Sequence, residues 1–101
     1  MGSSKITGFD IDPAYGLKQI QVSLPSSGWS DAAPYTQTVT VNGATATNII
    51  ICAPEPEQTN FEAVGECKVM CTAQAIDALT FTAYEGLPEI DLTFNILVGG
   101  E

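Results

Sequence analysis

Three cysteines are the residues of this chain best suited to chemistry, because a thiolate can act as a nucleophile or as a metal ligand. Cys67 and Cys71 fall on one face of a predicted strand, where a rise of about 3.3 Å per residue places them about 13 Å apart. A disulfide needs Cα atoms within roughly 4.4–6.8 Å, so these two cannot pair on one strand. A zinc site would find only Cys52 as a third thiolate. We expect small buried apolar side chains, while a bridge from Cys52 to either of the others stays sterically open.

The chain contains no histidine, which excludes the usual Ser–His–Asp and Cys–His catalytic arrangements. Two carboxylate pairs, Asp10/Asp12 and Glu55/Glu57, stand in connections rich in proline or glycine, where we expect solvated acids rather than an acid–base pair. The first pair begins like a calcium loop, but the glycine and the distant glutamate of that loop are missing. The sequence therefore predicts no enzyme, no cofactor and no metal site.

The single tryptophan, Trp29, stands in a polar loop at residues 26–33, and Tyr35 follows closely. An exposed aromatic pair in a loop is suited to contact a sugar or a receptor. The ring could equally fold back over one end of the core and fix the loop there. The sequence leaves both interpretations open.

The charge of the chain is strongly negative, with twelve acidic residues against three lysines and a net charge of −9. Binding to nucleic acid requires cations that neutralise phosphate, so we expect no nucleic-acid partner. Anionic membrane surfaces are excluded for the same reason. No apolar run approaches the roughly 20 residues of a membrane span, so we expect no membrane insertion. The acidity favours solubility.

The elements that must position these residues are mainly strands, because apolar and polar residues alternate with period two. A continuous apolar run at 48–53 predicts a strand covered on both faces, and one short helix fits near residues 58–65. The alternating segments are 17–24, 35–42, 67–74, 79–84 and 90–98.

Six or seven short strands separated by turns are typical of an all-β fold, here an antiparallel β-sandwich of Ig-like or jelly-roll-like type. We expect the sandwich domain at residues 17–98. Residues 1–16 are predicted to form an extended arm with a short strand at Ile6–Ile11, and residues 99–101 a flexible tail.

The run from Ser23 to Val41 resembles a module of structural proteins of phages and prophages of Gram-positive bacteria, found in tail-fibre, head-fibre and baseplate-associated chains. The shared pattern is a strand, then Gly28-Trp29-Ser30, then Pro34-Tyr35-Thr36-Gln37-Thr38-Val39. The similarity continues across residues 20–98, through Cys71-Thr72-Ala73-Gln74 and Leu79-Thr80-Phe81-Thr82-Ala83.

The resemblance implies a non-enzymatic virion protein, associated with a fibre, a baseplate or the capsid, that acts in assembly or host attachment after synthesis in the bacterial cytoplasm. The implied partners are other virion proteins, a host surface glycan and further copies of the chain, with a trimer favoured. The related modules often end a longer fibre, whereas a short arm precedes this one, which favours a small accessory protein. We expect the arm to dock on a neighbouring virion protein, or alternatively to close its own sheet, through Ile6, Phe9, Ile11 and Tyr15.

Two other functions stay open at this point. A carbohydrate- or receptor-binding module would use the loop around Trp29 together with Tyr35. An acidic inhibitor of host defence that imitates DNA would place its acids along one face, whereas here they fall mostly in predicted turns.

Overall fold

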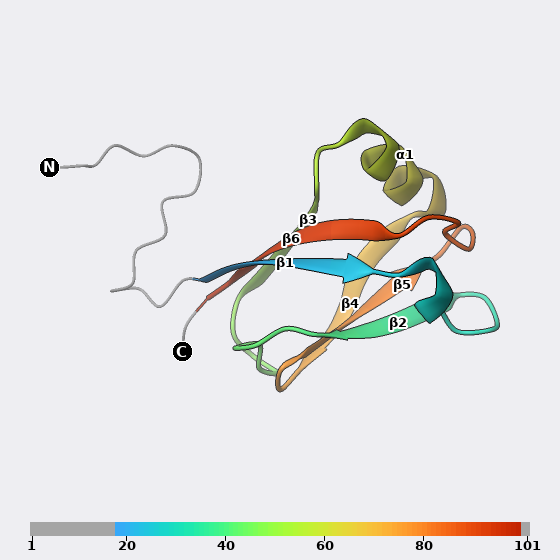
Figure 1. Cartoon of the computed structure of the whole chain (residues 1–101). Coiled ribbons are helices and arrows are strands. Elements are labelled where there is room, and N and C mark those ends of the chain that lie inside the picture. Colours follow the sequence, from blue (N-terminus) through green and yellow to red (C-terminus); the bar gives the residue numbers. More distant parts are fainter. Residues whose placement is uncertain (1–17, 100–101) are drawn as a thin grey trace, which may run out of the picture.

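The computed structural model describes residues 18–99, in which the chain forms six strands and one α-helix (Figure 1). Residues 1–17 and 100–101 lie outside this description, and with them the predicted arm, its short strand and most of the predicted tail. In chain order the elements are β1 (Lys18–Leu24), the 3-10 turn η2 (Ser26–Gly28), β2 (Tyr35–Thr40), β3 (Ile50–Pro54), α1 (Gln58–Cys67), β4 (Val69–Ala75), β5 (Ala78–Ala83) and β6 (Leu92–Val98).

The strands form two antiparallel three-stranded sheets that face each other as two layers (Figure 1). In the first sheet β6 lies between β1 and β3, and in the second sheet β5 lies between β2 and β4. The helix α1 carries the chain from the edge strand β3 of the first sheet to the edge strand β4 of the second. The predicted all-β antiparallel sandwich is confirmed, as is the single short helix.

The core lies between the two central strands, because their period-two alternation turns every second side chain inward. Phe81 of β5 and Phe94 of β6 meet there with ring centroids 4.9 Å apart and planes tilted by 47°. Tilted aromatic pairs at this distance add to the stabilisation that apolar burial provides. The other fully buried side chains around this pair include Leu24, Val41, Leu79, Leu92 and Ile96.

The predicted strand at 48–53 exists in part, but its burial on both faces is wrong. It forms β3, which has a hydrogen-bonded neighbour on one side only. Ile51 points away from the core and is 49 % exposed, and Ile49, just before the strand, is 72 % exposed. The apolar run reflects an edge strand with one uncovered face, which period-based reasoning cannot separate from a strand buried on both faces.

The predicted strand at 67–74 is also partly wrong. Cys67 is the last residue of α1, and Lys68 then adopts left-handed backbone angles (φ 56°, ψ 58°) that end the helix before β4 begins. A bulge between Cys71 and Ala73 shifts the alternation, so that Gln74 is half-buried. Cys67 and Cys71 therefore belong to different elements, and the strand-based separation of about 13 Å does not apply.

Asn60 fastens α1 to the first sheet. The Glu57 side chain caps the helix by accepting a hydrogen bond from the Asn60 backbone N–H at 2.9 Å. The Asn60 side chain, 6 % exposed, donates to the carbonyl oxygens of Glu55 and Thr93 at 2.9 and 3.1 Å. Its Oδ1 accepts from the Thr93 N–H at 2.8 Å. The start of the helix is thus hydrogen-bonded to the beginning of β6.

Candidate functional site

Trp29 lies in the core rather than on the loop surface. Trp29 is 8 % exposed and belongs to the cluster of buried apolar residues. Of the two interpretations that the sequence left open, this is the one in which the ring folds back over the core. Its indole N–H is buried with no hydrogen-bond acceptor among residues 18–99, at a cost of roughly 1–3 kcal/mol. Tyr35 is half-buried and packs against the same cluster. The ring of Trp29 is therefore turned away from any ligand at the loop surface.

The residues around Trp29 build a structural corner, which we call the Trp29 corner (residues 25–37). A Cβ on Gly28 would collide with Oε1 of Gln37, so only glycine permits the close approach of these two residues. The buried Gln37 amide donates to the Pro25 carbonyl at 3.2 Å. Ser30 and Thr36 exchange two bonds, Ser30 N–H to Thr36 O at 2.9 Å and Thr36 N–H to Ser30 Oγ at 3.0 Å. The Gly-Trp-Ser and Thr-Gln pattern thus has an architectural explanation.

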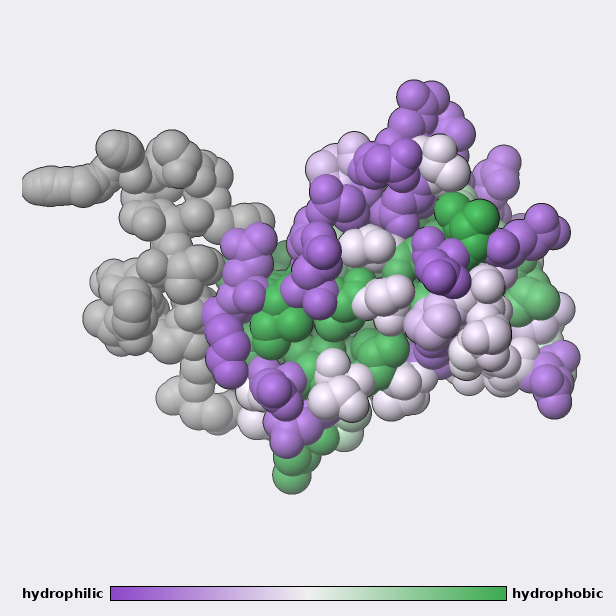
Figure 2. Space-filling view, viewed as in Figure 1, coloured by the Kyte–Doolittle hydropathy of each residue, from purple (hydrophilic) through white to green (hydrophobic). Residues whose placement is uncertain are grey.

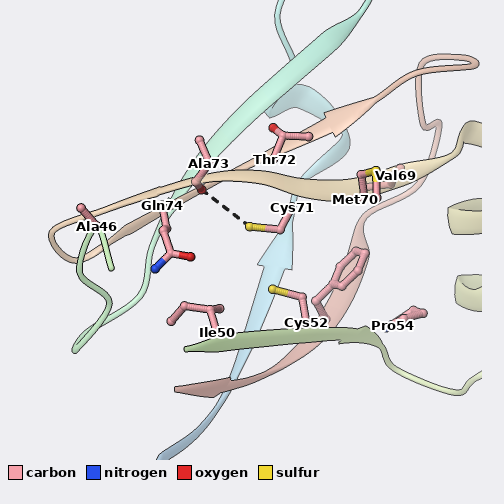
Figure 3. Close-up of a pocket in the computed structure, with 11 residues that line it drawn as sticks. Ala46, Ile50, Cys52, Pro54, Val69, Met70, Cys71, Thr72, Ala73 and Gln74 are labelled. Atoms are coloured by element: carbon pink, nitrogen blue, oxygen red, sulfur yellow. Dashed lines mark hydrogen bonds between the residues drawn. The ribbon is translucent and has the colours of Figure 1, made fainter. Parts of the chain in front are cut away.

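A cleft opens on the opposite side of the sandwich, between the edge strands β3 and β4 (Figure 3). We call it the β3/β4 cleft. Its volume is about 660 Å³, and its floor includes Phe94 of the core. The walls present polar and apolar surface, with Ile50, Cys52 and Pro54 from the first sheet and Val69, Met70 and Cys71 from the second. Such a cleft is suited to an extended ligand, because it lies between two strand edges.

Gln74 closes one end of this cleft. Its amide Nε2 donates to the carbonyl oxygens of Thr45 and Asn48 at 2.7 and 2.8 Å. The Asn48 side chain in turn donates to the Gly99 carbonyl at 2.7 Å. These bonds tie β4 to the segment that leads into β3 and to the end of β6. At the other end, α1 connects the two walls covalently.

The thiols of Cys52 and Cys71 both lie in the cleft, one on each wall (Figure 3). Burial is the main cause that raises the pKa of Cys52 from 9.0 to about 12, and the negative charge and the hydrogen bond of the Cys71 side chain account for the rest of this rise. Cys71 Sγ also lies 3.6 Å from the Ala73 carbonyl, to which it donates. Since Cys52 stays protonated at neutral pH, it is neither a ready nucleophile nor a ready metal ligand.

Cys67 lies apart from this pair, at the end of α1. It lines a separate hollow together with Glu66, Glu89 and Leu87. Burial raises the pKa of Cys67, and the negative charges of Glu66 and Glu89 add to the effect. All three cysteines are free thiols and are partly buried, whereas we expected small buried apolar side chains.

The second carboxylate pair has structural partners. Glu57 caps α1, and Glu55 Oε1 accepts from the amides of Asn95 at 2.7 Å and Gln21 at 3.3 Å. The first pair, Asp10/Asp12, lies outside the described residues, as do the arm residues Ile6, Phe9, Ile11 and Tyr15. Residues 18–99 contain no cluster of three or more Cys, Asp or Glu side chains that could hold a metal ion.

Apolar side chains also reach the surface at several places. Seen from the side of β1 and β2, they gather where these two edge strands face one another, and hydrophilic side chains cover α1 (Figure 2). On the outer face of the first sheet, Ile51 and Leu97 line a hollow of about 320 Å³. Ile76, at the turn between β4 and β5, is 78 % exposed. The first sheet thus carries an uncovered apolar area along β3.

Sequence reasoning missed the β3/β4 cleft, because nothing in the pattern shows which strands become sheet edges. It also missed the inward position of Gln74, since the bulge before it reverses the alternation. The sequence left open which cysteine lies near Cys52. Only the arrangement of the two sheets brings Cys71 to the same cleft.

No protein-family model, no curated protein and no solved structure matches this chain. Within residues 18–99 the helix is too short and too polar to cross a bilayer.

Proposed function

We propose that this protein is a non-enzymatic structural or accessory protein of a bacteriophage virion, associated with a fibre, a baseplate or the capsid, that acts in assembly or host attachment. The observation that carries the proposal is the Trp29 corner. Gly28, Trp29, Ser30 and Gln37, which carry the resemblance to phage structural modules, each have a role in one compact piece of architecture. Because each of these residues has a structural role in this chain, we expect the phage modules that carry the same residues to form the same corner.

The uncovered edge β3 gives the proposal a surface for assembly. Ile49 and Ile51 are exposed next to an edge with unpaired backbone groups, and single-copy proteins usually protect such edges with charges, bulges or a covering segment. A neighbouring subunit that covered β3 would bury these side chains and satisfy the edge.

The chain enters the described domain close to this surface. Lys18 pairs with Val98, and Val98 pairs with Ile50 on its other side, so the arm joins the sheet at the end where β3 begins. Two strand spacings amount to roughly 10 Å, which a few residues of the arm can span. We expect the apolar arm residues to dock on a neighbouring copy, with a trimer as the favoured assembly.

Host attachment through the Trp29 loop is the second candidate. Residues 30–34 are all exposed, and they form the outer part of the Trp29 corner. Since the Trp29 ring is buried, a host glycan or receptor would meet these residues and the exposed part of Tyr35 instead.

Light scattering on the purified full chain tests the assembly role of the arm. We expect a defined trimer or larger ring that falls to the monomer mass when residues 1–16 are deleted. The matched variants keep the arm length: one replaces its apolar residues with serine, Ile6→Ser, Phe9→Ser and Ile11→Ser, and the other replaces only its polar residues, Ser3→Ala, Ser4→Ala and Thr7→Ala. The first should dissociate and the second should not. A monomeric full chain would contradict the proposal, as would dissociation of both variants.

A further inference from the structure

The two cysteines of the β3/β4 cleft occupy matching positions on opposite walls. Cys52 lies opposite Ile96 in the first sheet, and Cys71 lies opposite Phe81 in the second. Both partners are fully buried side chains of the central strands. Residues on the same level of neighbouring strands face the same side, so both thiols point inward from the sheet edges. Figure 3 shows the Cys52 side chain on β3 and the Cys71 side chain on β4, both with their sulfur atoms in the cleft, where the two side chains interact.

We propose that Cys52 and Cys71 are an oxidant-reactive dithiol, which a low-molecular-weight disulfide such as oxidised glutathione converts into a disulfide that ties β3 to β4. The bond would join the open edges of the two sheets and close the mouth of the cleft. This inference is independent of the proposed function, since it depends only on the described side chains.

The reaction proceeds in two exchange steps. The Cys71 thiol gives its proton to solvent, and the thiolate attacks one sulfur of the small disulfide, which breaks the S–S bond and releases one small thiolate. Cys52 then gives up its proton and attacks the Cys71 sulfur of the mixed disulfide, which releases the second small thiolate. The two leaving thiolates take up two protons. Two protein thiols are oxidised to one disulfide, and one small disulfide is reduced to two thiols.

The environment of Cys52 fixes this order. Its pKa of about 12 keeps it protonated at neutral pH, so the first attack comes from Cys71. After the first exchange, Cys71 is part of the mixed disulfide. Cys52 is then held beside the sulfur that it must attack.

Cys67 is the natural comparison within the same chain. It lies at the end of α1 in another hollow, beside Glu66 and Glu89, and has no second thiol across from it. Anionic reagents such as oxidised glutathione meet negative charges there. We therefore expect it to remain a free thiol when the pair in the cleft is oxidised.

The bond would enclose a loop of about 20 residues and restrict the unfolded chain. For a domain of this size we expect Tm to rise by on the order of 10 °C. A dithiol reductant should reverse the rise.

Intact mass and peptide mapping of the full chain after incubation with oxidised glutathione test the proposal. We expect a loss of about 2 Da, a crosslinked peptide that joins Cys52 to Cys71, one free thiol at Cys67, and the rise in Tm. Cys67→Ser should keep the mass loss and the higher Tm. Cys52→Ala and Cys71→Ala should lose both.

Peptide mapping of the unaltered chain does not depend on the folding of any variant, so it can test the disulfide without the variants. Glutathione adducts without an internal crosslink would overturn the proposal. A crosslink between two chains, seen as a dimer on a non-reducing gel, would overturn it as well. So would a rise in Tm that persists in Cys52→Ala.

Discussion

At the scale of single residues, Cys52 makes stability depend on pH in a defined direction. Burial raises its pKa from 9.0 to about 12, so the folded state holds this proton more tightly than the unfolded state does. The resulting stabilisation is fully present below pH 9 and is lost as the pH rises from 9 toward 12. The thiol is partly exposed, which reduces the size of the effect but not its sign.

We expect the free energy of unfolding to fall less steeply above pH 9 in Cys52→Ala than in the unaltered chain. Urea titrations in the presence of a reductant at pH 7.5 and pH 10.5 measure the two slopes. The two proteins differ only at residue 52, so the comparison isolates Cys52. Parallel slopes would show that the raised pKa does not contribute to folding.

At the scale of elements, the alternating strands were predictable because one face of each is buried in the sandwich. β1, β2 and β6 each fall within a predicted segment, and β5 begins one residue before the predicted segment 79–84. The edges were not predictable, since the apolar run that forms β3 has the same pattern as a strand covered on both faces. The end of α1 was missed for a local reason, because the left-handed angles at Lys68 come from a residue type that seldom adopts them. The β3/β4 cleft lies between two edge strands, so it could not be predicted either.

Asn60 provides a test of how α1 is held to the sheets. Asn60→Ala leaves the Thr93 N–H and the Glu55 carbonyl without their side-chain partner in a buried place. We expect a loss of about 2 kcal/mol in the free energy of unfolding. Gln58→Ala, which removes only an exposed bond to Glu62 on the same helix, should cost less than about 0.5 kcal/mol. Chemical denaturation measures both, and equal losses would contradict the role of Asn60.

At the scale of the whole molecule, two opposing effects act on association. The net charge of −9 makes copies of the chain repel one another. The uncovered apolar residues beside β3 favour contact. Salt weakens only the first effect, since the Debye length falls from about 10 Å at 0.1 M to about 3 Å at 1 M. The balance between them therefore responds to ionic strength.

We expect the association constant of the full chain to increase with salt, and the increase to require the apolar surface at β3. The double variant Ile49→Thr and Ile51→Thr keeps β-branched side chains, so the strand should persist while the apolar contact is lost. Ile76→Thr makes the same chemical change at the turn between β4 and β5, where the side chain is even more exposed. Light scattering over a range of protein concentrations at low and high salt compares the three proteins. If Ile76→Thr weakened association as much as the double variant, general hydrophobicity rather than the β3 edge would be the cause of association. That result would contradict the β3 edge as the assembly surface.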